Sequence, residues 1–400
     1  MKTRKLSVLL LCAALVISPL TACGEQKSAG KPLALSIVAG NHANTRLPNL
    51  NGPAVKNLVN QVVVNGGTID FVGVDGDPED ASEYGIKPPS TGGLSTTKQQ
   101  QIIAEETSQL LAYASSLKAK TPEVDTMAAL QTACRSLAAA AQDNRHILVL
   151  DSGLCTTGTM DFTKSDFLNA DPKAVADSLA AKDEIPDFSG VAVTWIGCGD
   201  TALPQRALTR PQQDRLKALW KAVIEKGKGT ADMKDDLPGS AASPAGYPKV
   251  SGVSLLSEAA DGFDGKGIVA FSEKQIRFIA DTARYADPEA AKQALAPVSA
   301  YMKQNPSFSA LLVGTTAGDG DEAYCLKLST ERAEAVRGTL AGSGVSAARV
   351  RTLGMGYKGP WHIPDTDGGK LIEPLASQNR KVLVMSASSD EASRLLAGST

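Results

Sequence analysis

Residues 309–340 read SALLVGTTAGDGDEAYCLKLSTERAEAVRGTL, and they decide the fold of the second half of the chain. The apolar run 309–313 predicts a buried strand, and the Gly- and Asp-rich residues after it predict a loop. Ser329 is a residue type that commonly caps helix N-termini, so we expect a helix from Ser329 to about Leu340. The stretch therefore predicts a strand, a polar loop and a helix in direct succession.

The sequence on either side continues this alternation. Further strands are expected at 268–271, near Val350 and at 381–385, and helices are expected as far as about Gln304. Alternating strands and helices favour an α/β domain. We place this domain at 263–388, with a short tail at 389–400.

Four short motifs of this domain resemble those of the OmpA-like C-terminal domain. The family pattern is G-H-T-D-x-x-G, Y-N, L-S-x-x-R-A and a closing N-R-[RK]-V. The matching residues are 314–320, Tyr324, 328–333 and 379–382. The spacing from the first motif through Tyr324 to Arg332 matches without a gap. The resemblance implies a βαβαβ-type α/β fold and a non-covalent contact with peptidoglycan.

The resemblance also implies which side chains hold the ligand. The family binds the peptidoglycan stem peptide, especially its diaminopimelate, through the Asp of the first motif and the Arg of L-S-x-x-R-A. Such a zwitterionic group needs an anion for its ammonium and a forked cation for its carboxylate. Here the Arg is Arg332, but Ala317 stands in place of the Asp, and Asp319 or Asp321 could supply an anion instead. The expected ligand-binding residues are Arg332, Asp319, Thr316 and Arg380.

Two further departures leave other roles open. Thr315 replaces the family His, and Cys325 replaces the Asn that follows Tyr324. Arg332 could instead pair with a nearby acid or carbonyl, and Arg380 could hold the final strand to the loop. The alternative function is therefore an interaction scaffold in the cell envelope, whose OmpA-like domain has lost peptidoglycan binding.

The N-terminal residues have the pattern of an export signal. Basic residues precede an apolar run at 8–17, which is too short to span a bilayer as a mature helix. The following Leu-Thr-Ala-Cys, ending at Cys23, resembles a bacterial lipobox. This implies removal of a signal peptide at 1–22 and lipid attachment (diacylglycerol, palmitate) to Cys23. Residues 23–32 would form a flexible tether at the cell membrane or at an outer membrane, facing the periplasm or the cell exterior.

Between tether and second domain, the sequence predicts a doubly wound, Rossmann-like α/β domain. Nearly continuous apolar strands are expected at 33–39, 69–74, 146–150 and 191–197, with amphipathic helices between them. We place the domain at 33–232. Residues 233–262 are rich in turn formers and predict a flexible linker.

The loop that begins at Asp151 loosely resembles that of von Willebrand factor A-type domains, in which D-x-S-x-S coordinates magnesium. Gly153 and Cys155 occupy the two serine positions, so we expect a vWA-like fold, no metal and no cofactor. A protein partner of this domain is left open. Cys155 and Cys198 follow strands expected to be neighbours, which permits a disulfide in an exported protein; two free buried thiols are the alternative.

Composition excludes several classes of function. The chain has 400 residues, 41 basic and 43 acidic, so no strong positive field favours nucleic acid. The low number of His residues, three, argues against a multi-histidine metal centre, and no motif pairs a nucleophile with a base, so we expect no enzyme. The sequence predicts a lipid-anchored envelope protein that links membrane and cell wall.

Overall fold

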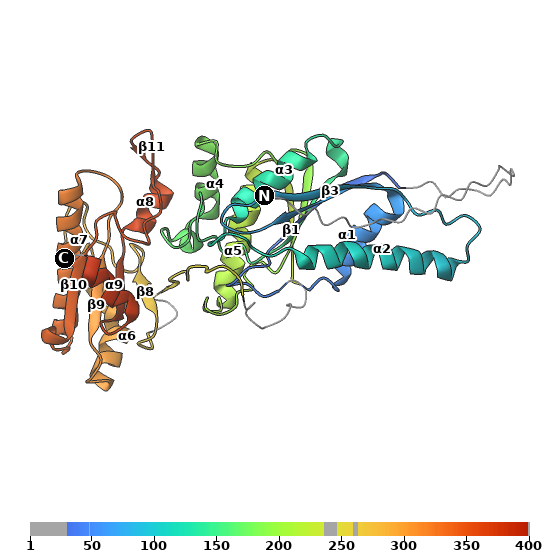
Figure 1. Ribbon diagram of the computed structural model, residues 1–400. Coiled ribbons are helices and arrows are strands. Elements are labelled where there is room, and N and C mark those ends of the chain that lie inside the picture. Colours follow the sequence, from blue (N-terminus) through green and yellow to red (C-terminus); the bar gives the residue numbers. More distant parts are fainter. Residues whose placement is uncertain (1–29, 48, 236–245, 259–262, 399–400) are drawn as a thin grey trace, which may run out of the picture.

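The computed structural model describes residues 30–47, 49–235, 246–258 and 263–398. The expected signal peptide 1–22, Cys23 and most of the tether 23–32 lie outside these ranges. The described chain forms two α/β units side by side, each built around one main sheet (Figure 1). Within these ranges, none of the helices combines the length and the apolar character needed to cross a bilayer.

The first sheet has the strand order β3-β2-β1-β4-β5-β6. Its strands are parallel except for β3, which runs antiparallel to β2. The bounds are β1 Leu33–Ala39, β2 Gly67–Gly73, β3 Asp80–Ile86, β4 Arg145–Leu150, β5 Val191–Ile196 and β6 Thr230–Lys234. The four strands predicted from apolar runs are present. The two that the sequence did not indicate, β3 and β6, are the edge strands, which need less apolar surface than central ones.

Helices cover both faces of this sheet, as expected of a doubly wound domain. On one face lie α1 (Pro53–Asn65) and α2 (Thr96–Ser116), and on the other lie α3 (Thr126–Leu137), α4 (Pro172–Ala181) and α5 (Arg210–Lys226). Two short 3-10 helices, Gln142–Asn144 and Phe167–Asn169, connect them. The fully buried rings of Trp195 and Trp220, with centroids 4.9 Å apart, pack between β5 and α5.

The second sheet has the order β10-β9-β13-β8-β7, with parallel pairs at its edges and antiparallel pairs around β13. The strands are β7 Leu256–Glu258, β8 Ile268–Phe271, β9 Ala310–Gly314, β10 Val350–Gly354 and β13 Val382–Ser386. The helices α6 (Pro288–Gln304) and α7 (Glu322–Gly342) pack on one face, and α9 (Asp390–Gly398) packs on the other. A 3-10 helix (Ala347–Arg349), a hairpin of β11 (Thr366–Asp367) and β12 (Lys370–Leu371), and α8 (Glu373–Asn379) complete the domain.

The N-terminus of α7 differs from the prediction. The cap is Asp321, whose carboxylate accepts the backbone N–H of Tyr324 at 3.1 Å, so the helix starts two turns earlier than expected. Ser329 lies fully buried in the helix interior, where its hydroxyl donates to the Leu326 carbonyl and accepts the Gly356 N–H. A serine in a helix bonds in this way to the preceding turn. The predicted cap at Ser329 is therefore wrong.

The segment predicted as a flexible linker is packed where the structure describes it. We call residues 246–258 the interdomain segment. Its Val250 is buried in the core of the first domain, and its last residues form β7, the edge strand of the second sheet. Residues 236–245 and 259–262 of the predicted linker lie outside the described ranges. The flexible-linker prediction is thus wrong for 246–258, because this segment contributes to both folded units.

Candidate functional site

The side chain of Arg332 lies almost completely inside the second domain. Its residue is 7% exposed, although it carries a positive charge. Its Nε donates to the carbonyl of Thr282 at 3.1 Å, and its guanidinium carbon lies 5.1 Å from the centre of the Phe278 ring. Within the described residues, no carboxylate lies within ion-pair distance of this guanidinium. A buried cation without a counter-ion is unusual and favours binding of an anion.

The surroundings of Arg332 are electrostatically mixed. Burial lowers the pKa of the Arg332 guanidinium, and the neighbouring positive charge of Arg380 lowers it further. Glu273, Tyr324 and Asp281 act in the opposite direction. Because burial and a like charge both disfavour the charged form, an added carboxylate at this position would relieve an unfavourable interaction.

Arg380 lies in the same electrostatic cluster but already has partners. Its two terminal nitrogens donate to the two carboxylate oxygens of Glu373 at 2.7 and 3.0 Å, and one of them also donates to Glu273 at 3.0 Å. Hydrogen bonding to Glu373, followed by Glu273, raises the pKa of Arg380. The structure therefore favours the structural alternative for Arg380, which ties α8 to the turn after β8.

The other predicted ligand residues lie on the loop between β9 and α7. Thr316 is buried, and its hydroxyl has no hydrogen-bond partner among the described residues. Asp319 is exposed, and its backbone carbonyl accepts from the thiol of Cys325 at 3.2 Å. Asp321 is the helix cap described above. Of the two acids on the loop, only Asp319 has a carboxylate exposed to solvent and outside the helix cap.

Two acidic residues near Arg332 were not predicted as site residues. Asp281 is exposed in the turn that brings Phe278 and Tyr285 together, and the hydroxyl of Tyr324 donates to its carbonyl at 3.4 Å. Glu273 follows β8. No sequence motif indicates either residue, because only the tertiary fold brings them near Arg332 of α7.

The position where the family Asp is missing has a carboxylate beside it. Ala317 is buried, and the N–H of the next residue, Gly318, donates to both oxygens of Asp365 at 3.2 and 3.0 Å. The side-chain amide of Asn379 also donates to Asp365, at 2.9 Å. Burial alone would raise the pKa of Asp365, but hydrogen bonds from His362, Asn379 and Gly318 lower it. Asp365 is only 1% exposed, so it fixes the loop and is not available to a ligand in this conformation.

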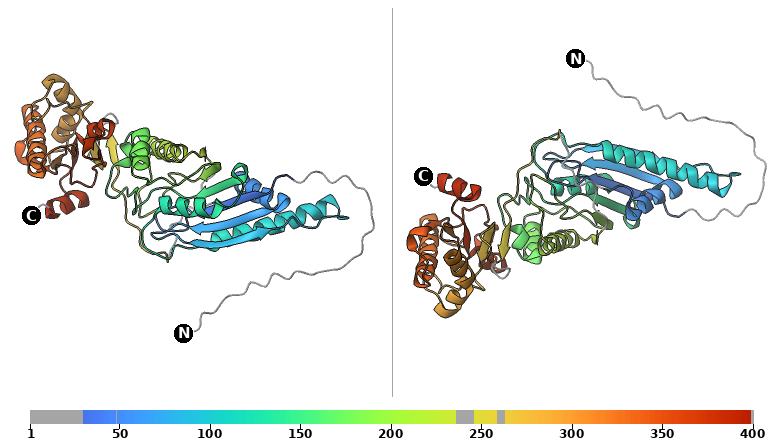
Figure 2. Two further views of the ribbon diagram at one scale, coloured as in Figure 1. Left: turned by 90° about the horizontal axis from the view of Figure 1, so that it is seen from above. Right: turned by 90° about the horizontal axis from the view of Figure 1, so that it is seen from below.

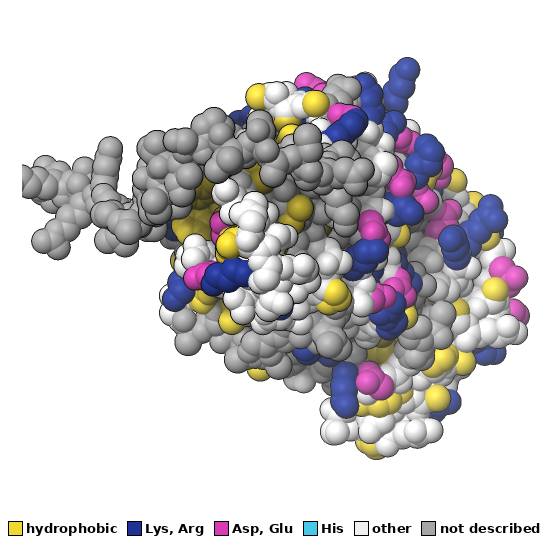
Figure 3. All heavy atoms as spheres, turned by 90° about the vertical axis from the view of Figure 1, so that its right-hand side faces the viewer, with side chains coloured by type: hydrophobic (Ala, Val, Ile, Leu, Met, Phe, Trp, Pro, Cys, Tyr) yellow, Lys and Arg dark blue, Asp and Glu magenta, His cyan; other side chains and the backbone are white. Residues whose placement is uncertain are grey.

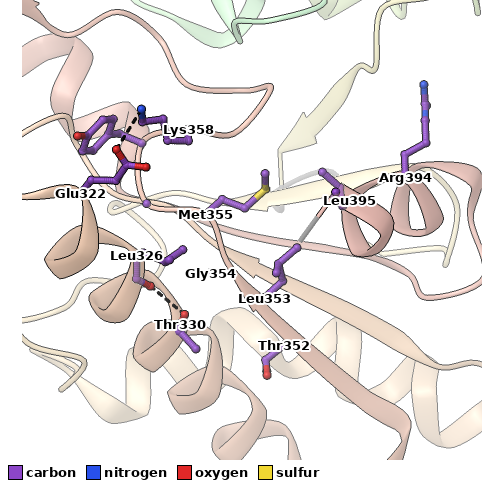
Figure 4. A pocket seen from close by; sticks show the side chains of 13 residues that line it. Glu322, Leu326, Thr330, Thr352, Leu353, Gly354, Met355, Lys358, Arg394 and Leu395 are labelled. Atoms are coloured by element: carbon purple, nitrogen blue, oxygen red, sulfur yellow. Dashed lines mark hydrogen bonds and ion pairs between the residues drawn. The ribbon is translucent and has the colours of Figure 1, made fainter. Parts of the chain in front are cut away.

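A separate groove lies at the free edge of β10. It has a volume of about 530 Å³ and apolar lining from Leu326, Leu353, Met355 and Leu395. Figure 4 shows these side chains below the ion pair between Lys358 and Glu322, whose atoms are 3.1 Å apart. Arg332 is not part of the lining, so the groove is distinct from the site around Arg332.

In the first domain, the Asp151 loop forms a closed polar cluster. Asp151 Oδ1 lies 2.7 Å from Nε2 of His42, and Asp151 Oδ2 accepts from the Thr126 hydroxyl at 2.9 Å and from the Gly153 N–H at 2.7 Å. Burial alone would raise the pKa of Asp151, but the charge and hydrogen bond of His42 and the bonds from Gly153 and Thr126 lower it. Among the residues that the structure describes, no group of three or more His, Cys, Asp or Glu is arranged to hold a metal ion.

The four cysteines of the described chain are free thiols, namely Cys134, Cys155, Cys198 and Cys325. The disulfide predicted between Cys155 and Cys198 is therefore not formed in the structure. Both residues are buried, but their neighbours differ: Cys155 lies beside Thr126, whereas Cys198 lies near Lys217. Burial raises the pKa of Cys155 to about 12.

Comparison with known proteins finds relatives of the second domain. Residues 278–370 match the family model described as "OmpA family". The probable lipoprotein YiaD of Escherichia coli K12 is 33% identical over 88 residues, which are 22% of this chain and 37% of that protein. The peptidoglycan-associated lipoprotein of Haemophilus influenzae is 37% identical over 62 residues, or 16% of this chain and 40% of that protein.

The chain thus spans less than half the length of these curated relatives. Among solved structures, the peptidoglycan-associated lipoprotein from Burkholderia pseudomallei is 28% identical, with a TM-score of 0.24, over 28% of this chain and 87% of that one. The motifs around Arg332 lie within the residues that match the family model. Residues 278–370 form a C-terminal OmpA-like domain with homology to peptidoglycan-associated lipoproteins.

Proposed function

We propose that this chain is a lipid-anchored protein of the cell envelope whose OmpA-like domain contacts peptidoglycan without covalent bonds. The observation that carries the proposal is Arg332, an almost buried guanidinium with no carboxylate partner among the described residues. Its two terminal nitrogens can hold a carboxylate of the stem peptide as a forked pair. The role is one of binding, with no chemical step.

An ammonium group of the same ligand needs an anion near Arg332. Asp281 and Glu273 both interact electrostatically with Arg332, and Asp281 is exposed. Asp319 is exposed on the neighbouring loop. We therefore extend the expected ligand-binding set by Asp281, while Asp319, Thr316 and Arg380 stay predictions.

The membrane contact is the second half of the proposal. The lipobox-like residues that end at Cys23 support acylation there, and burial of acyl chains contributes about 0.8 kcal/mol per methylene. Two contacts on one chain, lipid at one end and wall at the other, raise the effective concentration of each. The strand order and the antiparallel edge strand β3 support our inference that the first domain is vWA-like without its metal.

The proposal is tested by cosedimentation of the full mature chain, made soluble by Cys23→Ser, with purified peptidoglycan sacculi. Loss of a charge-assisted hydrogen bond costs roughly 1.5–3 kcal/mol, so Arg332→Ala should weaken binding about tenfold to a hundredfold. Arg332→Lys keeps the positive charge but loses the forked geometry of the guanidinium. Its affinity for sacculi should therefore lie between those of wild type and Arg332→Ala. Arg337→Ala, on the exposed face of the same helix, is the matched control and should bind like wild type.

The rival function has its own observation. Ala317 removes the family's anion, and Asp365 beside it is used internally. If wild type stays in the supernatant at all sacculus concentrations, the interaction-scaffold function replaces our proposal. If wild type and Arg332→Ala sediment equally while both stay folded by circular dichroism, wall contact lies elsewhere on the domain.

A further inference from the structure

The first domain has a closed edge where domains of its class usually bind ligands. Open α/β sheets take ligands beyond the carboxyl ends of their parallel strands. Here that edge carries the loops after β1, β4 and β5, with the buried pair of His42 and Asp151 among them. Both side chains are at most 1% exposed, so a ligand from solution cannot reach them in this conformation.

The interdomain segment lies across this edge and is bonded to several of its loops. Glu123 accepts from the N–H and the hydroxyl of Ser251 at 3.0 and 2.7 Å, and its own N–H donates to the Lys249 carbonyl at 3.1 Å. Asn44, in the loop after β1, donates to the Ser251 carbonyl at 2.7 Å.

The next residues of the segment are held in the same way. Gln205 exchanges hydrogen bonds with the backbone of Val253, at 2.7 and 3.4 Å, and Gln212 of α5 donates to the Leu256 carbonyl at 3.2 Å. Four separate parts of the first domain therefore form hydrogen bonds with the interdomain segment. The interdomain segment occupies the place where a separate ligand would lie.

The second domain packs on the interdomain segment and on the first domain. Nζ of Lys381 lies 2.7 Å from Oδ2 of Asp166, and the two side chains are 4% and 5% exposed. Trp361 donates to the Ser254 carbonyl at 3.1 Å, and the Ser254 hydroxyl donates to Glu391 at 2.7 Å. Beside Asp166, Ser254 and Trp361 remains a void of only about 10 Å³, which holds one water molecule at most.

Apolar contacts join the two units as well. Ile363 and Leu375 of the second domain are buried in the same hydrophobic cluster as the side chains of the first domain around α4 and α5. Figure 1 shows α8 next to α4, which agrees with direct contacts between these helices. The interface thus combines a dry ion pair, hydrogen bonds and a shared core.

We infer that the partner of the first domain at this edge is the second domain of the same chain: the first domain is a platform that holds the OmpA-like domain in one position. A buried ion pair costs desolvation energy and is favourable only in one good geometry, so it specifies the docked arrangement. The platform leaves no room for an external ligand at the same edge. The inference is independent of whether the OmpA-like domain binds peptidoglycan.

The test uses the full mature chain with Cys23→Ser, in calorimetry and small-angle X-ray scattering. Wild type should unfold in a single transition and scatter as one compact particle. Lys381→Met and Asp166→Asn each leave one buried group without its partner, so each should split the transition in two and enlarge the radius of gyration. The combined variant Asp166→Leu with Lys381→Met should restore much of the wild-type behaviour.

The exposed ion pair of Lys221 and Glu225 within α5 provides the matched control, since Glu225→Gln should change neither readout. Hydrogen exchange separates undocking from global unfolding. In Lys381→Met, exchange in the loops 40–45 and 151–156 should become at least about tenfold faster, while β1 and β4 stay protected.

Two results would overturn the inference. One is a wild-type chain that unfolds in two independent transitions with a scattering curve of freely moving domains. The other is a Lys381→Met variant that is folded and indistinguishable from wild type in radius, transition and loop exchange.

Discussion

At the scale of single residues, two arginines of one charge cluster have different roles because their partners differ. Arg380 forms a forked pair with Glu373 and a further bond with Glu273, so its charge is compensated within the protein. Arg332 is more buried, and among the described residues it has a backbone hydrogen bond and an aromatic contact but no carboxylate at ion-pair distance. The charge of Arg380 is thus satisfied within the fold, whereas in the proposed function the guanidinium of Arg332 pairs with an anion of the ligand.

The pair of His42 and Asp151 predicts a specific pH dependence. The pKa of Asp151 is lowered in the folded chain, so the ionised carboxylate stabilises the fold above its unfolded value of about 3.9, and this contribution is lost as the pH falls below that value towards the folded pKa. Asp151→Asn removes it. The stability difference between wild type and this variant should shrink as the pH falls from 6 to about 3. Denaturant unfolding at several pH values measures it.

His42→Ala should be more harmful than Asp151→Asn at neutral pH. It leaves the buried Asp151 carboxylate without the hydrogen bond to His42, and an unsatisfied buried group costs about 1–3 kcal/mol or more when charged, whereas removing an exposed ion pair costs about 0–1 kcal/mol. Glu225→Gln, which removes the exposed pair with Lys221, is the control for the lower value. A difference between wild type and Asp151→Asn that stays constant down to pH 3 would contradict the role given to Asp151.

The buried cysteines predict low thiol reactivity. Because burial raises the pKa values of Cys155 and Cys198, few thiolates exist near pH 8 in the folded chain. A thiol reagent should react slowly with the native Cys23→Ser chain and should titrate four thiols after denaturation. Two thiols after denaturation under non-reducing conditions would instead support the disulfide expected from the sequence.

At the scale of elements, two glycines set the distance between α7 and the sheet. A Cβ on Gly314 would lie 2.0 Å from the Ser329 carbonyl oxygen, and a Cβ on Gly354 would lie 2.1 Å from the Thr330 hydroxyl and 2.7 Å from the Leu326 carbonyl. The helix therefore contacts β9 and β10 almost backbone to backbone. This close packing places Arg332 in its buried position.

Gly354→Ala should destabilise the second domain by about 1–3 kcal/mol, because the helix must move away from β10. Gly338→Ala is the matched control on the same helix, since nothing lies within 4 Å of its Cβ position. Alanine is favoured over glycine in a helix by about 1 kcal/mol, so this variant should be more stable than wild type. Thermal unfolding of both variants measures the two changes in stability. Equal changes would show that the contact with β10 does not determine how closely α7 packs on the sheet.

The elements that sequence analysis missed are those with little apolar signal. The edge strand β6 has an alternating, half-exposed pattern over five residues, and α9 lies in the part expected to be a tail. The central strands were predictable because both of their faces are buried, which leaves a continuous apolar run. The early start of α7 was missed because Asp321 and Ser329 are both acceptable caps, and only the packing of Ser329 against Gly356 chooses between them.

At the scale of the whole molecule, the inferred docking makes the two domains a single spacer in the proposed function. The loops at the carboxyl ends of the strands face the second domain, so β1 begins at the far end of the first domain (Figure 2). In the proposed function, the full length of the first domain therefore separates the lipid-anchored end of the chain from the wall-binding site. Figure 3 shows basic and acidic side chains interspersed at this far end, as expected of a surface without one dominant charge.

The sequence by itself determined the central strands, most of the helices and the motifs that contain Arg332, because apolar periodicity and motif spacing are local properties. Only the tertiary structure decided which arginine is left without a carboxylate, which acids surround it and how the domains meet. Those outcomes depend on residues far apart in the chain, such as Asp166 and Lys381, which are 215 positions apart. Their pairing is set by shape and desolvation, which no local pattern records.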